Sequence, residues 1–289
     1  MNENSPAPVV VGVDGSDDSP STVILAAAYA ADRQSPLRIV HARAWPTYTG
    51  NPPLLTPPVA PIEDEPTARL IVDNARDLVR GVHPDVNVTG HVIDGGPAVV
   101  LIDESRHATL VVVGSHGHGG LARRALGSTA MDVAARATCP VLVVRGEVTR
   151  NGPVVVGVDG RGTSKAAIDF AFAEARARSV PLRAVHAWHH STNLVDTAES
   201  EADGRQRARS VLDEWLSDDR GNFGDVVVET VPVHQANPAR ALGEESAKAS
   251  LVVLGSRMRG ALRSRLLGST GYAMVHTSQC PVVIVRSAT

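Results

Sequence analysis

The sequence is one unit of about 145 residues written twice, and this internal repeat constrains the fold more than any other feature. A period of this length far exceeds that of a solenoid repeat, so each copy is expected to have its own core. The sequence therefore predicts two domains, 1–146 and 147–289. The matched segments are 9–15 with 154–160, 37–42 with 182–187, 110–115 with 251–256, and 126–129 with 267–270.

Within each copy, apolar runs typical of buried strands alternate with helical patterns. Strands alternating with helices predict a parallel sheet with right-handed crossovers. The expected fold class is α/β, with two tandem doubly wound, Rossmann-like domains of five strands and four helices each. Ser19, before Pro20, is the expected N-cap of the first helix. In the first copy we expect strands at 9–13, 37–42, 86–93, 110–113 and 141–144, and helices at 19–33, 67–80, 97–106 and 128–136.

Segment 46–66 carries seven prolines and is interpreted as a long surface loop, because proline interrupts helices and central strands. The net charge of −3 and the aromatic content of 3% argue against a nucleic-acid binder. Two cysteines exclude a disulfide-stapled scaffold. No apolar run reaches the roughly 18 residues of a membrane span, and the N-terminus lacks a signal-peptide pattern. We therefore expect a cytoplasmic protein without membrane or nucleic-acid partners.

Two features at the carboxyl ends of predicted strands have an unusual composition. Asp14 follows the first strand, and the glycine-rich loop 114–120 follows the fourth and leads to 127–129 at the start of a helix. Glycines allow close backbone approach, a helix N-terminus attracts anions, and Arg123 and Arg124 add positive charge. These features predict an anion site; the alternative is a flexible loop followed by an ordinary helix cap.

The glycine pattern differs from three better-known motifs. The chain contains no P-loop, no Gly-x-Gly-x-x-Gly after the first strand and no Gly-x-Ser-x-Gly. Instead, the spacing Gly114-x2-Gly117-x9-Gly127-Ser128 resembles the ATP-binding signature of the universal stress protein family. The runs Val-Gly-Val-Asp-Gly-Ser, Val-His-Ala and Cys-Pro-Val-Leu-Val-Val resemble the same family, once per copy, in the tandem form of actinobacteria.

The resemblance implies a cytoplasmic, usually dimeric, ATP-binding stress-response protein with a sheet of order 3-2-1-4-5. It places Asp14 near the ribose and adenine, Ala42 at the adenine edge, and 127–129 on the phosphates. The implied nucleotide-binding residues of the first copy are Gly12, Asp14, Ala42, Gly114, Ser115, Gly117, Gly119, Gly127, Ser128 and Thr129. Those of the second copy are Gly157, Asp159, Ala187, Gly255, Ser256, Gly260, Gly268, Ser269 and Thr270.

The second copy departs from the signature, because Met258 stands where the first copy has Gly117. The sequence leaves open whether this copy binds ATP: the methionine side chain could hinder binding, whereas four arginines of the loop add positive charge. His116 and His118 are interpreted as phosphate-loop or solvent-facing residues, and no metal site is expected, since no carboxylate or cysteine lies nearby. His41, His186, Cys139 and Cys280 are interpreted as structural.

Two functions remain open from the sequence. The first is an ATP-binding regulator without efficient catalysis, with Mg²⁺ as a possible companion of the nucleotide. The alternative is a slow ATPase or adenylyl-transferring enzyme of the adenine-nucleotide alpha-hydrolase-like group, which would need a positioned base or nucleophile. The apolar last strands, 141–144 and 282–285, are edges that need a cover, which a homodimer or an intramolecular pseudo-dimer would provide.

Overall fold

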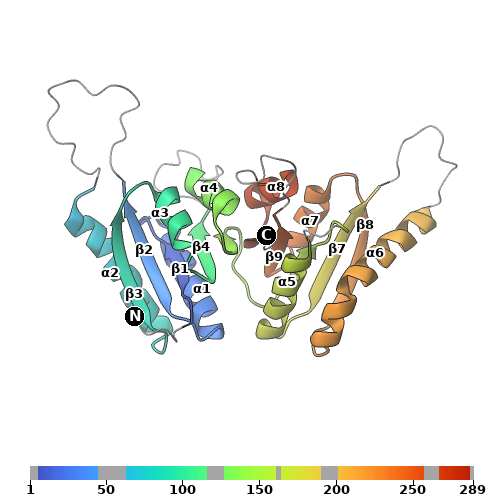
Figure 1. Cartoon of the computed structure of the whole chain (residues 1–289), viewed down its shortest axis with the longest axis horizontal. Helices are drawn as coiled ribbons and strands as arrows, with labels where there is room; N and C mark the ends of the chain where they lie inside the picture. The colour runs from blue at the N-terminus through green and yellow to red at the C-terminus, as the bar shows by residue number, and fades with distance from the viewer. Residues whose placement is uncertain are drawn as a thin grey trace, which may run out of the picture. The chain divides into compact units, whose positions relative to one another are not determined.

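The computed structural model describes residues 6–44, 63–115, 127–160, 164–189, 201–256 and 267–286. The chain divides into two compact units, Met1–Val141 and Leu142–Thr289. In each repeat, helices flank a sheet (Figure 1). Gly117, Gly119, Gly260, Met258 and the loop histidines and arginines lie outside the described residues, as does most of the proline-rich segment.

Strands and helices alternate along both repeats, as the apolar patterns predict. The first repeat contains β1 (Val9–Gly12), α1 (Ser19–Asp32), β2 (Leu37–Arg43), α2 (Glu65–Val82), β3 (Val88–Asp94), α3 (Pro97–Glu104), β4 (Leu110–Gly114), α4 (Ser128–Arg136) and β5 (Val141–Val144). The second contains β6 (Val154–Gly157), α5 (Lys165–Arg178), β7 (Leu182–Trp188), α6 (Glu201–Asn222), β8 (Val228–His234), α7 (Pro238–Ser246), β9 (Leu251–Gly255), α8 (Ser269–Thr277) and β10 (Val282–Val285).

The strand order confirms two doubly wound α/β repeats. It is β3-β2-β1-β4-β5 in the first repeat and β8-β7-β6-β9-β10 in the second. β1 pairs in parallel with β2 and β4, and β6 pairs in parallel with β7 and β9. The order reverses at β1 and β6, so the crevice at the carboxyl ends of these central strands is the expected ligand position of such a fold.

Helices cover both faces of each sheet because successive strand side chains point to opposite sides. On β2, the Arg38 guanidinium Nε donates to Glu104 of α3 at 2.7 Å. Three residues further on, the His41 ring contacts Glu63, just before α2, at 2.6 Å. α2 and α3 therefore lie on opposite faces, as the reversal of strand order requires.

The core is aliphatic. The three valines of β1 and Leu110 of β4 are fully buried, as is Phe172 of α5. Continuous burial along a strand is typical of a parallel sheet covered on both faces. Among the described helices, none has the length and apolarity needed to cross a membrane.

Two local expectations were wrong. Ser19 is the first residue of α1 rather than its cap; Asp18 occupies the N-cap position without a side-chain cap bond. Pro66 lies in the first turn of α2 rather than in the surface loop, because proline needs no N–H there and the Asp64 carboxylate accepts from Thr67 N at 2.9 Å. Residues 46–62 of that predicted loop lie outside the described part.

The segment that joins the repeats packs closely on the second unit. Gly146 has a φ of +61°, and a Cβ there would lie 2.1 Å from the carbonyl oxygen of Gln279. A Cβ on Gly152 would lie 2.5 Å from the carbonyl oxygen of Lys248. Only glycine permits such backbone contacts without displacement.

Candidate functional site

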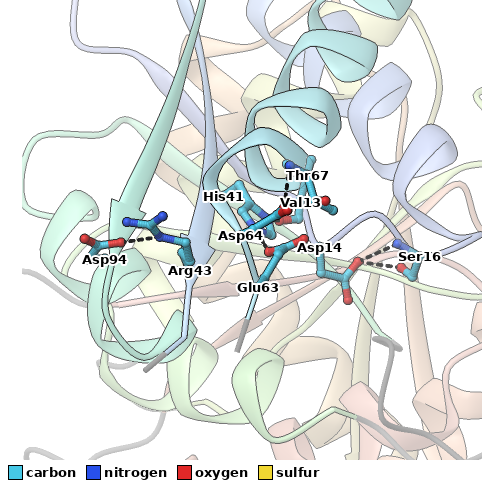
Figure 2. A network of polar contacts seen from close by, with 9 residues as sticks. All are labelled: Val13, Asp14, Ser16, His41, Arg43, Glu63, Asp64, Thr67 and Asp94. Carbon is cyan, nitrogen blue, oxygen red and sulfur yellow. Dashed lines mark hydrogen bonds and ion pairs between the residues drawn. The ribbon is translucent and has the colours of Figure 1, made fainter. Parts of the chain in front are cut away.

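A short turn after β1 orients the Asp14 carboxylate. Its Oδ1 accepts from Ser16 N at 3.0 Å, Ser16 Oγ at 2.6 Å and Ser19 Oγ at 3.1 Å. Gly15 has a φ of +79°, a left-handed conformation that favours glycine. Figure 2 shows this carboxylate beside the Ser16 contacts, at the carboxyl end of β1. The Ser19 hydroxyl thus donates to the Asp14 carboxylate instead of capping the helix.

The second repeat also holds its aspartate through a serine hydroxyl. Ser164 Oγ donates to Asp159 Oδ1 at 2.6 Å and accepts from Asp159 N at 3.1 Å. Gly160 has a φ of +67°. Ser164 and Ser19 occupy equivalent positions, 145 residues apart. Both repeats therefore hold an aspartate through a serine at the start of the following helix.

The helices α4 and α8 begin without a side-chain cap. Their N-cap residues are Gly127 and Gly268, neither of which makes a side-chain cap bond. By contrast, Asp64 of α2 and Asn237 of α7 accept from backbone N–H groups of the first turn. An uncapped helix start leaves backbone donors and partial positive charge available to an anion.

A pocket of about 150 Å³ lies at the carboxyl ends of the second repeat's strands. It brings together residues that are far apart in the sequence. Seven of the predicted site residues line it: Gly157, Asp159, Ala187, Gly255, Gly268, Ser269 and Thr270. The remaining lining residues are Val158, Ser164, Val185, His186, Pro238, Leu242, Leu254 and Gly271.

Two predicted residues of the second repeat are not among those lining this pocket. Ser256 is buried, and its N–H donates to the Val285 carbonyl at 2.8 Å. Gly260 lies outside the described residues. In the first repeat, Ser115 is buried and its carbonyl accepts from Gly127 N at 2.9 Å. This bond joins the end of β4 to the start of α4, so it brings together two parts of the predicted signature.

The glycines that end β1 and β6 permit close packing as well. A Cβ on Gly12 would lie 2.7 Å from Cδ1 of Leu101 in α3, and one on Gly157 would lie 2.8 Å from Cδ2 of Leu254. Both distances are too short without a shift of the leucine. Glycine is therefore needed at these two positions because leucine side chains pack directly against the backbone. Gly157 also lines the pocket.

A histidine on the second strand of each repeat forms a hydrogen bond with the backbone of the turn that contains the aspartate. Nδ1 of His41 lies 2.8 Å from the Val13 carbonyl oxygen, and Nδ1 of His186 lies 2.7 Å from that of Val158. A carbonyl oxygen only accepts, so each Nδ1 carries a proton. These contacts agree with the structural role predicted for both histidines. His41 also contacts Glu63, a partner that the sequence does not indicate.

The two repeats differ at one cross-strand position next to the predicted adenine edge. Arg43 pairs in register with Asp94, to which it donates from Nε at 2.6 Å (Figure 2). This hydrogen bond raises the pKa of Arg43. At the equivalent register, Trp188 stacks on His234 with ring centroids 4.3 Å apart. The first repeat therefore has an ion pair where the second has an aromatic stack.

The cysteines lie apart from these groups. Cys139 and Cys280 are buried, each two residues before the last strand of its repeat rather than within it. Burial raises the pKa of each thiol to about 11. In the part of the chain that the structure describes, no group of three or more His, Cys, Asp or Glu side chains is arranged to hold a metal ion.

Sequence reasoning missed three kinds of residue around the site. Ser164 and Ser19 could have been found from their spacing of five after an aspartate, since serine often bonds a nearby carboxylate or backbone group. Glu63 gives no such signal, because 21 residues separate it from His41. Pro238 and Leu242 of α7 also line the pocket, and no sequence motif singles them out.

Two doubly wound α/β repeats in tandem, the second with a pocket at the carboxyl ends of its strands, define the class of this protein. The model of the universal stress protein family matches residues 7–145 and 151–286. The chain is 37% identical over 289 residues to a universal stress protein of Mycobacterium tuberculosis, covering 97% of each chain. It is 33% identical over 290 residues to one of Mycolicibacterium smegmatis, covering 96% of each.

A solved structure shares the fold across the whole chain. The universal stress protein of Archaeoglobus fulgidus has a TM-score of 0.65 at 16% identity, covering 98% of this chain and 99% of that one. The chain belongs to the universal stress protein family.

Proposed function

We propose that the protein binds ATP at the carboxyl ends of its strands and acts as a nucleotide-dependent stress regulator without efficient catalysis. The observation that carries the proposal is the pocket of the second repeat. Seven residues chosen for their resemblance to an ATP signature line one cavity there, although they come from four separate segments of the repeat.

The phosphate end of this proposal rests on α4 and α8. Both helices have nine residues and begin at Gly-Ser-Thr, with no side-chain cap on the first-turn amides. Backbone N–H groups and the helix dipole favour an anion at this position. The hydroxyls of Ser128 and Ser269 are further donors in the same turn.

The nucleoside end rests on the aspartates after β1 and β6. A carboxylate is an acceptor with about four lone-pair sites, so Asp14 and Asp159 can receive bonds from ribose hydroxyls beyond those from serine. The pocket volume of about 150 Å³ is below the roughly 300 Å³ at which sites for whole drug-sized ligands begin. In this proposal, the described residues form only part of the nucleotide site.

The test begins with nucleotide released from the denatured, purified full-length protein and identified by mass spectrometry. Thermal unfolding with added ATP, with and without Mg²⁺, then measures binding directly, because a ligand that binds only the folded state raises Tm. We expect ATP to raise Tm, and Asp14→Asn combined with Asp159→Asn to reduce the rise. Asp77→Asn is the matched control, since Asp77 is an exposed aspartate on α2.

Two outcomes would count against the proposal. Absence of both released adenine nucleotide and a thermal shift with ATP would refute binding. Rapid phosphate release that is lost in the aspartate variants would instead favour the enzyme alternative. A regulator predicts phosphate release no faster than the slow background of the buffer.

A further inference from the structure

His41 joins two parts of the first repeat that are distant in sequence. The ring is 4% exposed, with Nδ1 at 2.8 Å from the Val13 carbonyl and Nε2 at 2.6 Å from Glu63 Oε2. Figure 2 shows the ring between these two groups. The Val13 carbonyl oxygen only accepts, so Nδ1 donates to it, and the 2.6 Å contact at Nε2 is a second hydrogen bond.

Each end of this bridge is fixed to a functional element. The Val13 carbonyl belongs to the peptide bond that leads into Asp14, so holding that oxygen restricts the orientation of the aspartate turn. Glu63 directly precedes Asp64, which caps α2 through Thr67 N at 2.9 Å. The ring therefore ties the Asp14 turn to the start of α2.

The second repeat makes half of this bridge. His186 Nδ1 contacts the Val158 carbonyl at 2.7 Å, which reproduces the first contact. Among the residues that the structure describes, no carboxylate bonds to its Nε2, and His186 lines the pocket. The two aspartate turns are thus held differently, although their serine and glycine positions are equivalent.

We propose that His41 and Glu63 are positioning residues for nucleotide binding in the first repeat. The pair fixes the Val13–Asp14 peptide in the orientation that the ligand needs, and the described residues of the second repeat form no such pair. This inference rests on the proposed function, because it assigns a role in nucleotide binding. Its structural part, the fixing of the turn, can be measured without any ligand.

The experiment compares four variants of the full chain. Glu63→Ala removes the contact, and Glu63→Gln keeps a hydrogen-bonding group of the same length, whose amide can donate to a neutral ring. Glu65→Ala is the matched control: it removes a carboxylate two residues away that pairs only with exposed Arg69 of the described residues. His41→Asn retains a donor near Nδ1 but cannot reach Glu63.

Hydrogen exchange of two segments provides the readout for each repeat separately. Without ligand, we expect faster exchange in 10–19 for Glu63→Ala and His41→Asn, and wild-type exchange for Glu65→Ala. With ATP, the concentration of ATP that gives half-maximal protection should rise about tenfold in 10–19, or about 1.4 kcal/mol, which is within the range for one hydrogen bond. It should stay unchanged in 154–160. Glu63→Gln should behave nearly like the wild-type protein in both measurements.

Three results would overturn the inference, and they differ from failure of the proposed function. The inference fails if Glu63→Ala behaves like Glu65→Ala, if both segments respond equally, or if Glu63→Gln is no better than Glu63→Ala. If wild-type protein shows no ATP protection in either segment, the proposed function fails. Faster ligand-free exchange in 10–19 would then still support the fixing of the turn.

Discussion

A buried ion pair in α5 offers the sharpest test of the energetics. Arg178 Nη2 donates to Glu174 Oε2 at 2.9 Å, and their side chains are only 4% and 3% exposed. The change Glu174→Gln keeps the shape of the side chain but leaves the guanidinium without this counter-charge. Removing one partner of a buried pair costs about 3–5 kcal/mol. A domain has about 5–15 kcal/mol of stability in total, so the loss is large.

Urea unfolding measures this loss in the repeat that carries it. Two of the three tryptophans, Trp188 and Trp215, lie in the second repeat, so indole fluorescence reports mainly on its unfolding. With a urea dependence of about 2 kcal/mol per molar, the loss lowers the midpoint by roughly 1.5–2.5 M. A smaller slope in the variant would instead indicate a change in the unfolded or native ensemble.

The same repeat contains the control. Glu201 and Arg205 of α6 form a pair with the same spacing, but their side chains are 63% and 54% exposed. Glu201→Gln should cost less than about 1 kcal/mol, as exposed pairs do. If Glu174→Gln is no more destabilising than Glu201→Gln, the argument from burial is refuted.

Two further predictions concern packing and reactivity. A Cβ on Gly204 of α6 would lie 2.2 Å from the Trp188 ring, whereas one on Gly221 of the same helix meets nothing within 4 Å. Gly204→Ala should therefore destabilise by about 1–3 kcal/mol and Gly221→Ala should stabilise by about 0.5–1 kcal/mol in urea unfolding; equal effects would contradict the contact. Burial raises the pKa of the Cys139 and Cys280 thiols from 9.0 to about 11. Ellman's reagent at pH 8 should thus label the folded protein at least about a hundredfold more slowly than the unfolded protein, and rapid labelling of folded protein would show that the thiols are accessible.

The regular elements could be predicted because their apolar patterns are local. The helix 128–136 and the strand 141–144 have the predicted bounds, and the alternation of strands and helices predicted the parallel sheet. The strand order came from the resemblance to the family. The start of α2 was missed because proline was read as a helix breaker, although Pro66 occupies the first turn, where it is tolerated.

The site was harder to predict because its contacts depend on register. The seven lining residues predicted for the second repeat came from a glycine spacing and from short runs at strand ends, each of which is local in the sequence. The Arg43–Asp94 contact follows only once β2 and β3 are aligned, and the same holds for Trp188 and His234. No spacing links His41 of β2 to Glu63, because Glu63 lies outside the strands and helices.

The cross-strand difference between the repeats affects how their parts could be exchanged. Arg43 bonds to Asp94, whereas Trp188 stacks on His234, and each pair spans two neighbouring strands. A hybrid that carried β2 of one copy beside β3 of the other would place tryptophan against aspartate or arginine against histidine. A functional chimera of the two copies would therefore need to take both neighbouring strands, β2 with β3 or β7 with β8, from the same copy.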